Sequence, residues 1–277
     1  MRIALAQMCS GIDPHENSLT LRSNIDEASK GRADILFTPE MTGIVDRDRA
    51  RAAPNICSEQ DDPVLAEAQA GAVRNKIWLC LGSLALRPDE AVDDKWVNRS
   101  FLINPDGDIV ARYDKIHLFD VDLETGESWR ESSAYSGGTQ AVVAPVGTAA
   151  LGMSVCYDIR FSRLYSALAY GGATVISIPA AFTVPTGEAH WAVLLRARAI
   201  ECAAFVVAAA QCGKHQDGRE TYGHSMVVDP WGNILLDMAD GTGVAFCDID
   251  LDEVSKVRGR IPALENQRDF EHPEAPS

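Results

Sequence analysis

The sequence predicts an α/β protein built from two stacked sheets with helices on the outside. Short β-branched runs alternate with amphipathic stretches along the whole chain of 277 residues. Apolar residues make up 46% and charged residues 23%, which is ordinary globular composition. The same order of elements also occurs twice, so the two halves are expected to form similar layers related by a pseudo-twofold axis.

Two matched blocks carry this internal repeat. Residues 33–39 (ADILFTP) match residues 173–179 (ATVISIP) at an offset of 140, and residues 100–109 (SFLINPDGDI) match residues 225–234 (SMVVDPWGNI) at an offset of 125. Two matches in the same order favour a true repeat over chance recurrence of a strand and a turn. No linker separates the halves, so residues 1–277 are expected to form one domain, with 262–277 as a C-terminal tail.

The elements follow from periodicity and from helix and turn signals. A helix is expected to end at Gly31, strands are expected to end at Pro39 and Pro179, and an Asn-Pro-Asp-Gly turn is expected to close a hairpin. The expected elements of the first half are strands at 2–8, 34–38 and 77–85, helices at 17–30 and 63–74, and a hairpin at 97–114. Those of the second half are strands at 151–156, 174–178, 204–211 and 244–249, helices at 162–170 and 189–201, and a hairpin at 222–238.

Charge and apolar runs exclude several classes of partner. With 25 Lys+Arg against 40 Asp+Glu, the net charge of −15 argues against nucleic acid, which is bound by clustered cations. The longest apolar run, residues 202–210, is far shorter than the roughly 20 residues of a membrane-spanning helix. The N-terminus lacks the pattern of a signal peptide. Seven cysteines without a CxxC motif suit reduced thiols. We expect a cytoplasmic protein.

Cys156 and Glu40 are the first candidates for chemistry. Cys156 is expected at a strand-to-helix turn, where free backbone N–H groups can lower the pKa of a thiol and bind an oxyanion. Glu40 follows Pro39 at the end of an apolar strand, and the equivalent residue of the second half is Ala180, so the fold alone does not require a carboxylate there. In an apolar setting the pKa of Glu40 is expected to be raised, which suits a general base.

Lys115 ends the first hairpin and is a candidate to hold a negative oxygen. His117 offers a different scheme, a Cys–His pair, because it lies two residues from Lys115 and would share its face of a strand. The two schemes differ in which substitution removes alkylation of the thiol, His117→Ala for the pair or Glu40→Gln for a glutamate base. The residues alone leave both open.

Metal and nucleotide cofactors have no support in the sequence. The remaining histidines show no HxxxH spacing and no cysteine pairing of the kind that binds zinc. Neither GxGxxG nor GxxxxGK[ST] occurs. No metal and no organic cofactor are expected.

Three blocks together resemble the catalytic motifs of the nitrilase superfamily, the carbon–nitrogen hydrolases. They are FTPEMTG around Glu40, RYDKIHLFD around Lys115 and MSVCYDIRF around Cys156. The resemblance implies a four-layer αββα sandwich with an internal pseudo-twofold repeat, and a homodimer or larger assembly whose C-terminal segment reaches over the neighbour. It implies that Cys156 is the nucleophile, Glu40 the general base, and Lys115, with the backbone N–H of Tyr157, the oxyanion stabiliser.

The resemblance also implies a second glutamate, in a segment of the form ESxxxxPG. The match is Glu131 in RESSAYSG, where Ser136 replaces the proline, and Glu124 and Glu127 are nearby competitors. Glu131 would keep Lys115 charged and help to orient the substrate.

The block at 182–191 (FTVPTGEAHW) resembles the branch whose amidases act on α-keto acid amides. Phe182, Thr183 and Tyr222 are expected to line the substrate pocket with Tyr157, whereas Arg160 and Arg198 are expected to be structural. The implied reaction is hydrolysis of a small α-keto acid amide to a carboxylate and ammonia through a cysteine thioester. The alternatives are ω-amidase activity on α-ketoglutaramate, N-carbamoyl amino acid hydrolysis, and a non-catalytic nitrilase-like binding protein.

Overall fold

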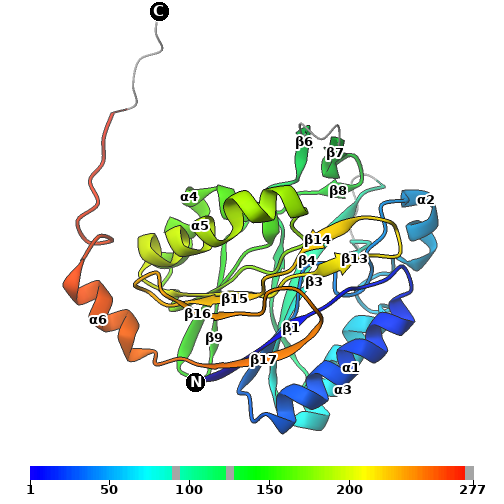
Figure 1. Cartoon of the computed structure of the whole chain (residues 1–277), viewed down its shortest axis with the longest axis horizontal. Helices are drawn as coiled ribbons and strands as arrows, with labels where there is room; N and C mark the ends of the chain where they lie inside the picture. The colour runs from blue at the N-terminus through cyan, green and yellow to red at the C-terminus, as the bar shows by residue number, and fades with distance from the viewer. Residues whose placement is uncertain (89–93, 123–127, 272–277) are drawn as a thin grey trace, which may run out of the picture.

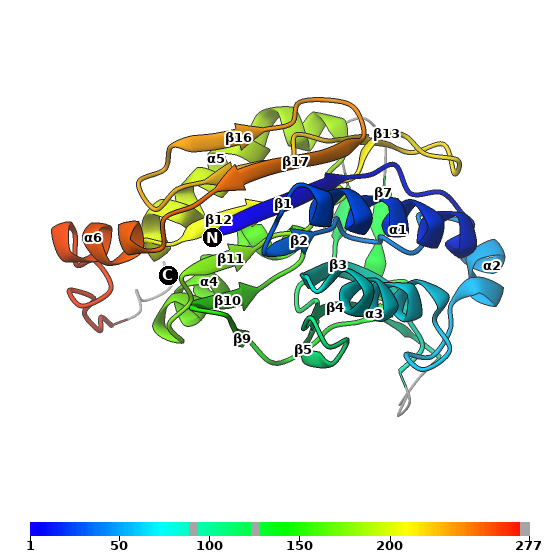
Figure 2. The ribbon, with the colours of Figure 1, turned by 90° about the horizontal axis from the view of Figure 1, so that it is seen from below.

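The computed structural model describes residues 1–88, 94–122 and 128–271, and it contains two large sheets packed face to face (Figures 1 and 2). The first sheet has the order β17 (Gly243–Asp248), β1 (Arg2–Gln7), β2 (Ile35–Phe37), β3 (Trp78–Leu86), β4 (Trp96–Ile103) and β5 (Ile109–Asp114), and β8 (Tyr135–Ser136) pairs with β4. The second has the order β16 (Ile234–Asp237), β15 (Met226–Val228), β12 (Phe205–Ala208), β11 (Val175–Ser177), β10 (Ala149–Met153) and β9 (Val142–Val146).

The strand pairing confirms the internal repeat. Strands β1, β2 and β3 are parallel, as are β10, β11 and β12, and in both sheets two antiparallel strands follow on one side and one antiparallel strand flanks the other. Helices α1 (Pro14–Lys30) and α3 (Pro63–Asn75) cover the first sheet, and α4 (Ser162–Tyr170) and α5 (Val184–Cys202) lie on the opposite side of the molecule (Figure 1). The predicted four-layer αββα arrangement is confirmed.

Alternation along the strands builds two cores. In β1, Ile3 and Leu5 belong to the core that includes residues of both sheets, whereas Ala4 and Ala6 belong to the core under α1 and α3. All four are fully buried, because side chains of a strand point alternately to its two faces and both faces here are covered. Burial of each large aliphatic side chain stabilises the fold by about 2 kcal/mol.

Several boundaries differ from those predicted. Helix α1 begins at Pro14, three residues early, because the Asp13 side chain accepts the His15 N–H as an N-cap. Helix α5 begins at Val184 rather than 189. Strand β10 ends at Met153, so Cys156 opens a 3₁₀ turn, η3 (Cys156–Arg160), rather than ending a strand.

Short elements that the sequence pattern did not reveal complete the chain. Two small ribbons pair β6 (Asp120–Asp122) with β7 (Ser128–Arg130) and β13 (Cys212–Lys214) with β14 (Glu220–Tyr222). The others are α2 (Arg49–Ala52), η1 (Ala53–Asn55), η2 (Glu131–Ser133) and α6 (Asp252–Arg260). The second hairpin is β15–β16 and begins at Met226, because Tyr222 belongs to β14.

The C-terminal tail begins after α6. The Tyr170 hydroxyl donates a hydrogen bond to the Leu264 carbonyl over 2.9 Å, so this part of the tail contacts α4 of its own chain. Residues 272–277 lie outside the described part. Among the described residues, no helix is both long and apolar enough to cross a membrane.

Candidate active site

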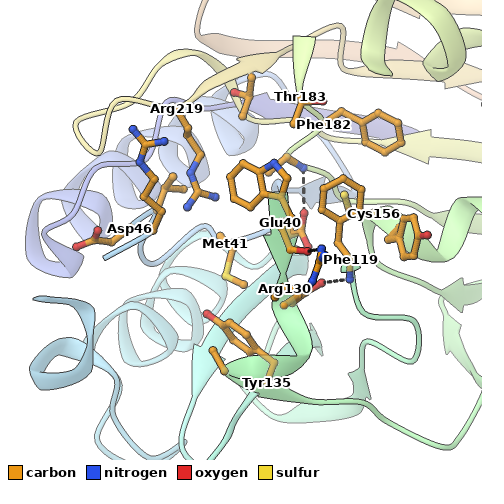
Figure 3. Close-up of a pocket in the computed structure, with 18 of the residues that line it drawn as sticks. Glu40, Met41, Asp46, Phe119, Arg130, Tyr135, Cys156, Phe182, Thr183 and Arg219 are labelled. Carbon is orange, nitrogen blue, oxygen red and sulfur yellow. Dashed lines mark hydrogen bonds between the residues drawn. The ribbon is translucent and has the colours of Figure 1, made fainter. Parts of the chain in front are cut away.

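The candidate side chains meet beyond the carboxyl ends of β2, β5 and β10. A cavity of about 880 Å³ opens there, lined by Glu40, Lys115, Glu131 and Cys156. Figure 3 shows Glu40 and Cys156 in the middle of this cavity. Open α/β sheets place ligand sites at such strand ends. The structure therefore brings together the four side chains that the sequence singled out for catalysis. The competitors Glu124 and Glu127 lie outside the described residues.

Cys156 is held in a conformation that few non-glycine residues adopt. Its φ angle is +49°, and its N–H donates to the Pro179 carbonyl at the end of β11 over 2.8 Å. Such backbone strain persists only where surrounding contacts fix it, and it occurs often at functional sites. Cys156 and Glu40 line the same cavity, and each shifts the pKa of the other.

The Glu40 carboxylate is buried and fully engaged. Its Oε1 accepts hydrogen bonds from Lys115 Nζ and Asn98 Nδ2, each at 3.0 Å, and its Oε2 accepts the Ala181 N–H at 3.0 Å. Only 5% of the residue is exposed, so an unpaired charge would be costly there. These donors fix one carboxylate orientation beside the thiol.

Lys115 lies between two glutamates. Its Nζ is 3.0 Å from Glu40 Oε1 and 2.8 Å from Glu131 Oε2, and the residue is 2% exposed. Glu131 Oε2 also accepts the Phe119 N–H at 2.6 Å, which ties it to the segment after β5. One buried cation is therefore shared by two carboxylates.

The pKa values of the site correct two expectations. Burial alone would raise the pKa of Glu40, but the charge of Lys115 and hydrogen bonds from Cys156, Lys115 and Asn98 bring it below its ordinary value. Burial and the neighbouring Glu40 charge raise the pKa of Cys156 well above the ordinary thiol value, although Lys115 opposes them. The resting site thus holds a carboxylate beside a neutral thiol. The expected raised pKa of Glu40 and lowered pKa of the thiol are both wrong.

Lys115 also keeps its proton. Burial would lower its pKa, but the charges of Glu131, Glu40 and Cys156 raise it well above the ordinary lysine value. An ammonium group at this position can stabilise a developing oxyanion.

His117 is directed away from the thiol. Its Nδ1 lies 2.7 Å from Asp158 Oδ1, its ring stacks on Phe161 with centroids 3.6 Å apart, and it is absent from the cavity lining. Strand β5 ends at Asp114, so His117 and Lys115 do not share a strand face. The buried Asp158 also accepts the Tyr113 hydroxyl at 2.7 Å and the Val155 N–H at 2.9 Å, which links the Lys115 segment to the Cys156 turn.

Three of the four predicted substrate-binding residues line the cavity. They are Tyr157, Phe182 and Thr183. Tyr222 does not: it stacks on His224 with centroids 4.3 Å apart and its ring lies against Gly187. The sequence pattern placed Tyr222 at the start of the hairpin expected at 222–238, whereas it is the last residue of β14 in the β13–β14 ribbon.

The two arginines expected to be structural have different environments. Arg198 is buried and its Nε donates to the Ile159 carbonyl over 2.8 Å, as a structural residue does. Arg160 lines the cavity instead, with its guanidinium 5.6 Å from the Phe182 ring centroid and 6.0 Å from that of Tyr157, and it has no carboxylate partner among the described residues.

Sequence reasoning missed the residues that orient Glu40. Gln211 Nε2 donates to the Glu40 carbonyl at 3.0 Å and to Ser10 Oγ at 2.8 Å. Asn98 lies in β4 (WVNRSFLI), where it is fully buried although it is polar. Because polar residues occupy three successive positions of that strand, its sequence offers no clear sign that Asn98 is buried. In the part of the chain that the structure describes, no cluster of three or more His, Cys, Asp or Glu could hold a metal.

The fold combines two pseudo-symmetric sheets with a buried cluster of Cys156, Glu40 and Lys115 at the strand ends. The carbon-nitrogen hydrolase family model matches residues 2–259. The chain belongs to this family, the nitrilase superfamily, whose members hydrolyse carbon–nitrogen bonds other than peptide bonds.

Relatives and solved structures agree with this assignment. Deaminated glutathione amidase of Yersinia enterocolitica is 38% identical over 96% of this chain and 92% of its own length. The crystal structure of the Caenorhabditis elegans NitFhit protein has a TM-score of 0.88 at 35% identity, covering 96% of this chain and 65% of that one. A glutamate-to-glutamine variant of the amidase from Nesterenkonia sp. AN1, at 26% identity and a TM-score of 0.78, covers 95% of this chain and 98% of that one and carries acrylamide added to its active-site cysteine.

Proposed function

We propose that this chain hydrolyses an amide of an α-keto acid through a thioester on Cys156, and that its substrate is deaminated glutathione. The observation that carries the chemistry is the buried Lys115–Glu40 ion pair in the cavity that Cys156 also lines, in which Lys115 keeps Glu40 ionised. The substrate is suggested by relatives of that name at 36–38% identity over nearly the whole chain.

The first half of the reaction forms the thioester. The thiol proton passes to Glu40 as the sulfur attacks the amide carbonyl, because a neutral thiol beside a carboxylate favours transfer during attack over a preformed thiolate. Lys115 Nζ and the N–H of Tyr157 stabilise the tetrahedral oxyanion. Tyr157 lies in the first turn of η3, where backbone N–H groups have no intrahelical partner. Glu40 then protonates the departing amine.

The second half releases the acid. Glu40, ionised again, takes a proton from a water molecule that attacks the thioester carbonyl, and the thiol leaves with that proton. Glu131 holds Lys115 in place during both steps through its hydrogen bonds. The sequence of steps needs no electron transfer.

The leaving group differs from the ammonia expected above. Deaminated glutathione carries no primary amide, since the γ-amide nitrogen belongs to its cysteinyl residue. Hydrolysis there releases α-ketoglutarate and cysteinylglycine, whereas α-ketoglutaramate would release ammonia. A cavity of about 880 Å³ lies near the upper end of the roughly 300–1,000 Å³ range of ligand sites, which favours the larger amide.

The cavity charge supports an anionic substrate. Six cationic side chains line it against four anionic ones, in a protein whose net charge is −15. The six are Arg47, Arg49, Lys115, Arg130, Arg160 and Arg219, and the four are Glu40, Asp46, Glu131 and Glu220. Arg160 is free of carboxylates and close to Cys156, so we propose that it binds the α-keto acid carboxylate.

The test compares three amides. Initial rates of α-ketoglutarate release from deaminated glutathione and from α-ketoglutaramate, and of ammonia release from an N-carbamoyl amino acid, are measured with Cys156→Ala as control. A preference for deaminated glutathione that is lost in the variant supports the proposal. Preference for either other amide assigns that activity instead. If none of the three amides is hydrolysed but Cys156 is still alkylated, the substrate is a different amide. If none is hydrolysed and the thiol is also unreactive, the protein is non-catalytic.

We propose further that two copies associate through the outer face of α5. Val193 and Ile200 on this helix are 68% and 52% exposed, and Trp231 in the β15–β16 turn is 50% exposed. The turn packs on α5, since Arg196 Nε donates to the Gly232 carbonyl over 2.8 Å. Light scattering should give a dimer mass, and Val193→Asp should reduce it to that of a monomer. A monomer mass for the unmodified chain would reject this surface.

A reducing compartment fits the thiols. All seven cysteines are free in the structure, and Cys80, Cys156, Cys202 and Cys212 are buried. We therefore propose a cytoplasmic location, in which the nucleophile stays reduced.

A further inference from the structure

One wall of the cavity is a row of aromatic rings with a guanidinium at each end. Arg160 lies 6.0 Å from the Tyr157 ring centroid, Tyr157 is 5.1 Å from Phe119, and Phe119 is 6.2 Å from Trp129. Arg219 lies over Trp129, 5.1 Å from its centroid. The first end adjoins the nucleophile. The second lies beside Asp46, on the far side of Glu40 from Phe182 (Figure 3).

The Arg219 end is held rigidly from behind. The buried Asp217 carboxylate accepts Arg219 Nε at 2.8 Å and the Arg219 N–H at 3.0 Å, and it also accepts the Arg47 N–H at 2.9 Å. These bonds leave the two terminal nitrogens of Arg219 without a hydrogen-bond partner among the described residues. A guanidinium fixed at Nε with its terminal nitrogens unpaired is oriented to receive a carboxylate.

The acids at this end leave the terminal nitrogens of Arg219 available, although Asp217 pairs with its Nε. Asp46 is bound by Arg51, with both oxygens at 2.7 Å from guanidinium nitrogens. Glu220 is exposed at the β14 end of the cavity lining. Arg47 lines the cavity and forms no ion pair within the described part of the chain. Arg47 and Arg219 therefore lie at one end of the cavity, where Arg219 is paired with Asp217 through Nε alone and the exposed Glu220 is the remaining acid of the lining without an ion pair among the described residues.

We propose that Arg219, oriented by Asp217 and assisted by Arg47, binds a carboxylate on the leaving-group side of the amide. This inference rests on the proposed function. A carbonyl under attack by Cys156 has its acyl chain and its amine on opposite sides, and the cavity offers a cationic group in each direction. The site then selects an amine that ends in a carboxylate, as a dipeptide does, over ammonia or a neutral amine.

The test uses two matched substrates. One is deaminated glutathione, and the other is the same molecule with its terminal carboxylate converted to a carboxamide. The unmodified enzyme should show a kcat/KM about tenfold or more higher on the acid, since a charge-assisted hydrogen bond is lost with the carboxamide. Arg219→Gln should lower kcat/KM on the acid by a similar factor and leave the carboxamide rate nearly unchanged. Arg219→Lys should keep part of the preference.

Two further variants serve as a second test and as a matched control. Arg47→Gln should reduce the same preference less, and it carries the test if Arg219→Gln does not fold. Arg112→Gln removes an exposed arginine of β5 that pairs with Glu59 outside the cavity, and it should change neither rate. Equal rates on acid and carboxamide, or equal losses on both in Arg219→Gln, would overturn this inference alone. No hydrolysis of either compound by the unmodified enzyme would overturn the proposed function together with it.

Discussion

The two halves of the molecule repeat one arrangement of strands and helices but carry different side chains where the strands end. Leu5 pairs with Phe37 in the first sheet as Met153 pairs with Ser177 in the second, so Cys156 is equivalent to Met8. Glu40 is equivalent to Ala180 by the offset of 140. The repeat thus explains the fold, whereas only one copy of each strand end carries a reactive group.

The same contrast holds for the cation. Lys115 is buried and paired, whereas the residue 125 positions later is Asp240, which is exposed and of opposite charge. The site is assembled across the halves: the first supplies Glu40 and Lys115, and the second supplies Cys156 and the Ala181 N–H that binds Glu40. Pseudo-symmetry therefore separates what the fold requires from what the chemistry requires.

The largest effect is expected at the pair Cys156 and Met8. Cys156→Ala should lower kcat by about 10⁴-fold or more, because Cys156 is the proposed nucleophile and no other cysteine among the described residues lines the cavity. Met8→Leu, at the equivalent position, conserves volume and should cost less than about 1.5 kcal/mol of stability with turnover retained. Initial rates and thermal unfolding of both variants measure this. An equal loss of kcat in the two variants would mean that Cys156 contributes to turnover through packing rather than through its thiol.

Glu40→Gln should separate turnover from thiol reactivity. Loss of the base should reduce kcat by about 10³-fold. Alkylation of Cys156 by iodoacetamide should persist, because the Glu40 charge raises the pKa of Cys156 and its removal leaves Lys115 to favour the thiolate. This replaces the expectation that Glu40→Gln abolishes alkylation, and it accords with the acrylamide adduct on a glutamine variant of the Nesterenkonia amidase. An inert thiol in Glu40→Gln, confirmed by mass spectrometry, would contradict it.

Lys115→Met should destabilise the fold by about 3 kcal/mol near neutral pH, since it leaves the buried Glu40 and the half-buried Glu131 without their cation. Arg112→Met, in the strand that precedes Lys115 and with a partly exposed ion pair to Glu59, should cost less than about 1 kcal/mol. Denaturant unfolding of both variants gives these values. A loss in Lys115→Met no larger than in Arg112→Met would show that the buried cation is dispensable.

The Lys115→Met deficit should also depend on pH. The pKa of Glu40 is lowered in the folded protein, so its contribution is complete above the ordinary glutamate pKa and is lost as pH falls through the lower folded value. The raised pKa of Lys115 contributes below the ordinary lysine pKa and is lost as pH rises through the folded value. In the variant, burial raises the pKa of Glu40, so the deficit should shrink from pH 7 toward pH 4. A stability deficit that stays constant over this range would mean that Glu40 is already neutral at pH 7 in the Lys115→Met variant.

The sequence predicted the four layers and the residues that meet in the cavity. It did not predict properties that depend on distances between residues far apart in the chain. The repeat, the strand ends and three blocks predicted Glu40, Lys115 and Cys156. The sign of the Glu40 pKa shift could not be predicted, because it depends on a 3.0 Å contact between residues 75 positions apart. Arg219 and Trp129 carry no signal, since loops and short ribbons bring them to the cavity. Tyr222 was misplaced because the β13–β14 ribbon has no apolar alternation.

The smallest effect is expected at His117, which tests the Cys–His scheme directly. His117 Nδ1 donates to the Asp158 carboxylate rather than to the thiol, and its ring is packed on Phe161. His117→Ala should cost about 1–2 kcal/mol of stability, because a buried carboxylate loses one partner and keeps three other hydrogen bonds. Alkylation of Cys156 should be unchanged. The value of kcat/KM should fall less than tenfold, because Asp158 would be held less firmly beside the Cys156 turn. Loss of alkylation in His117→Ala, with Glu40→Gln fully active, would contradict the proposal that Glu40 is the base. The base would then be His117.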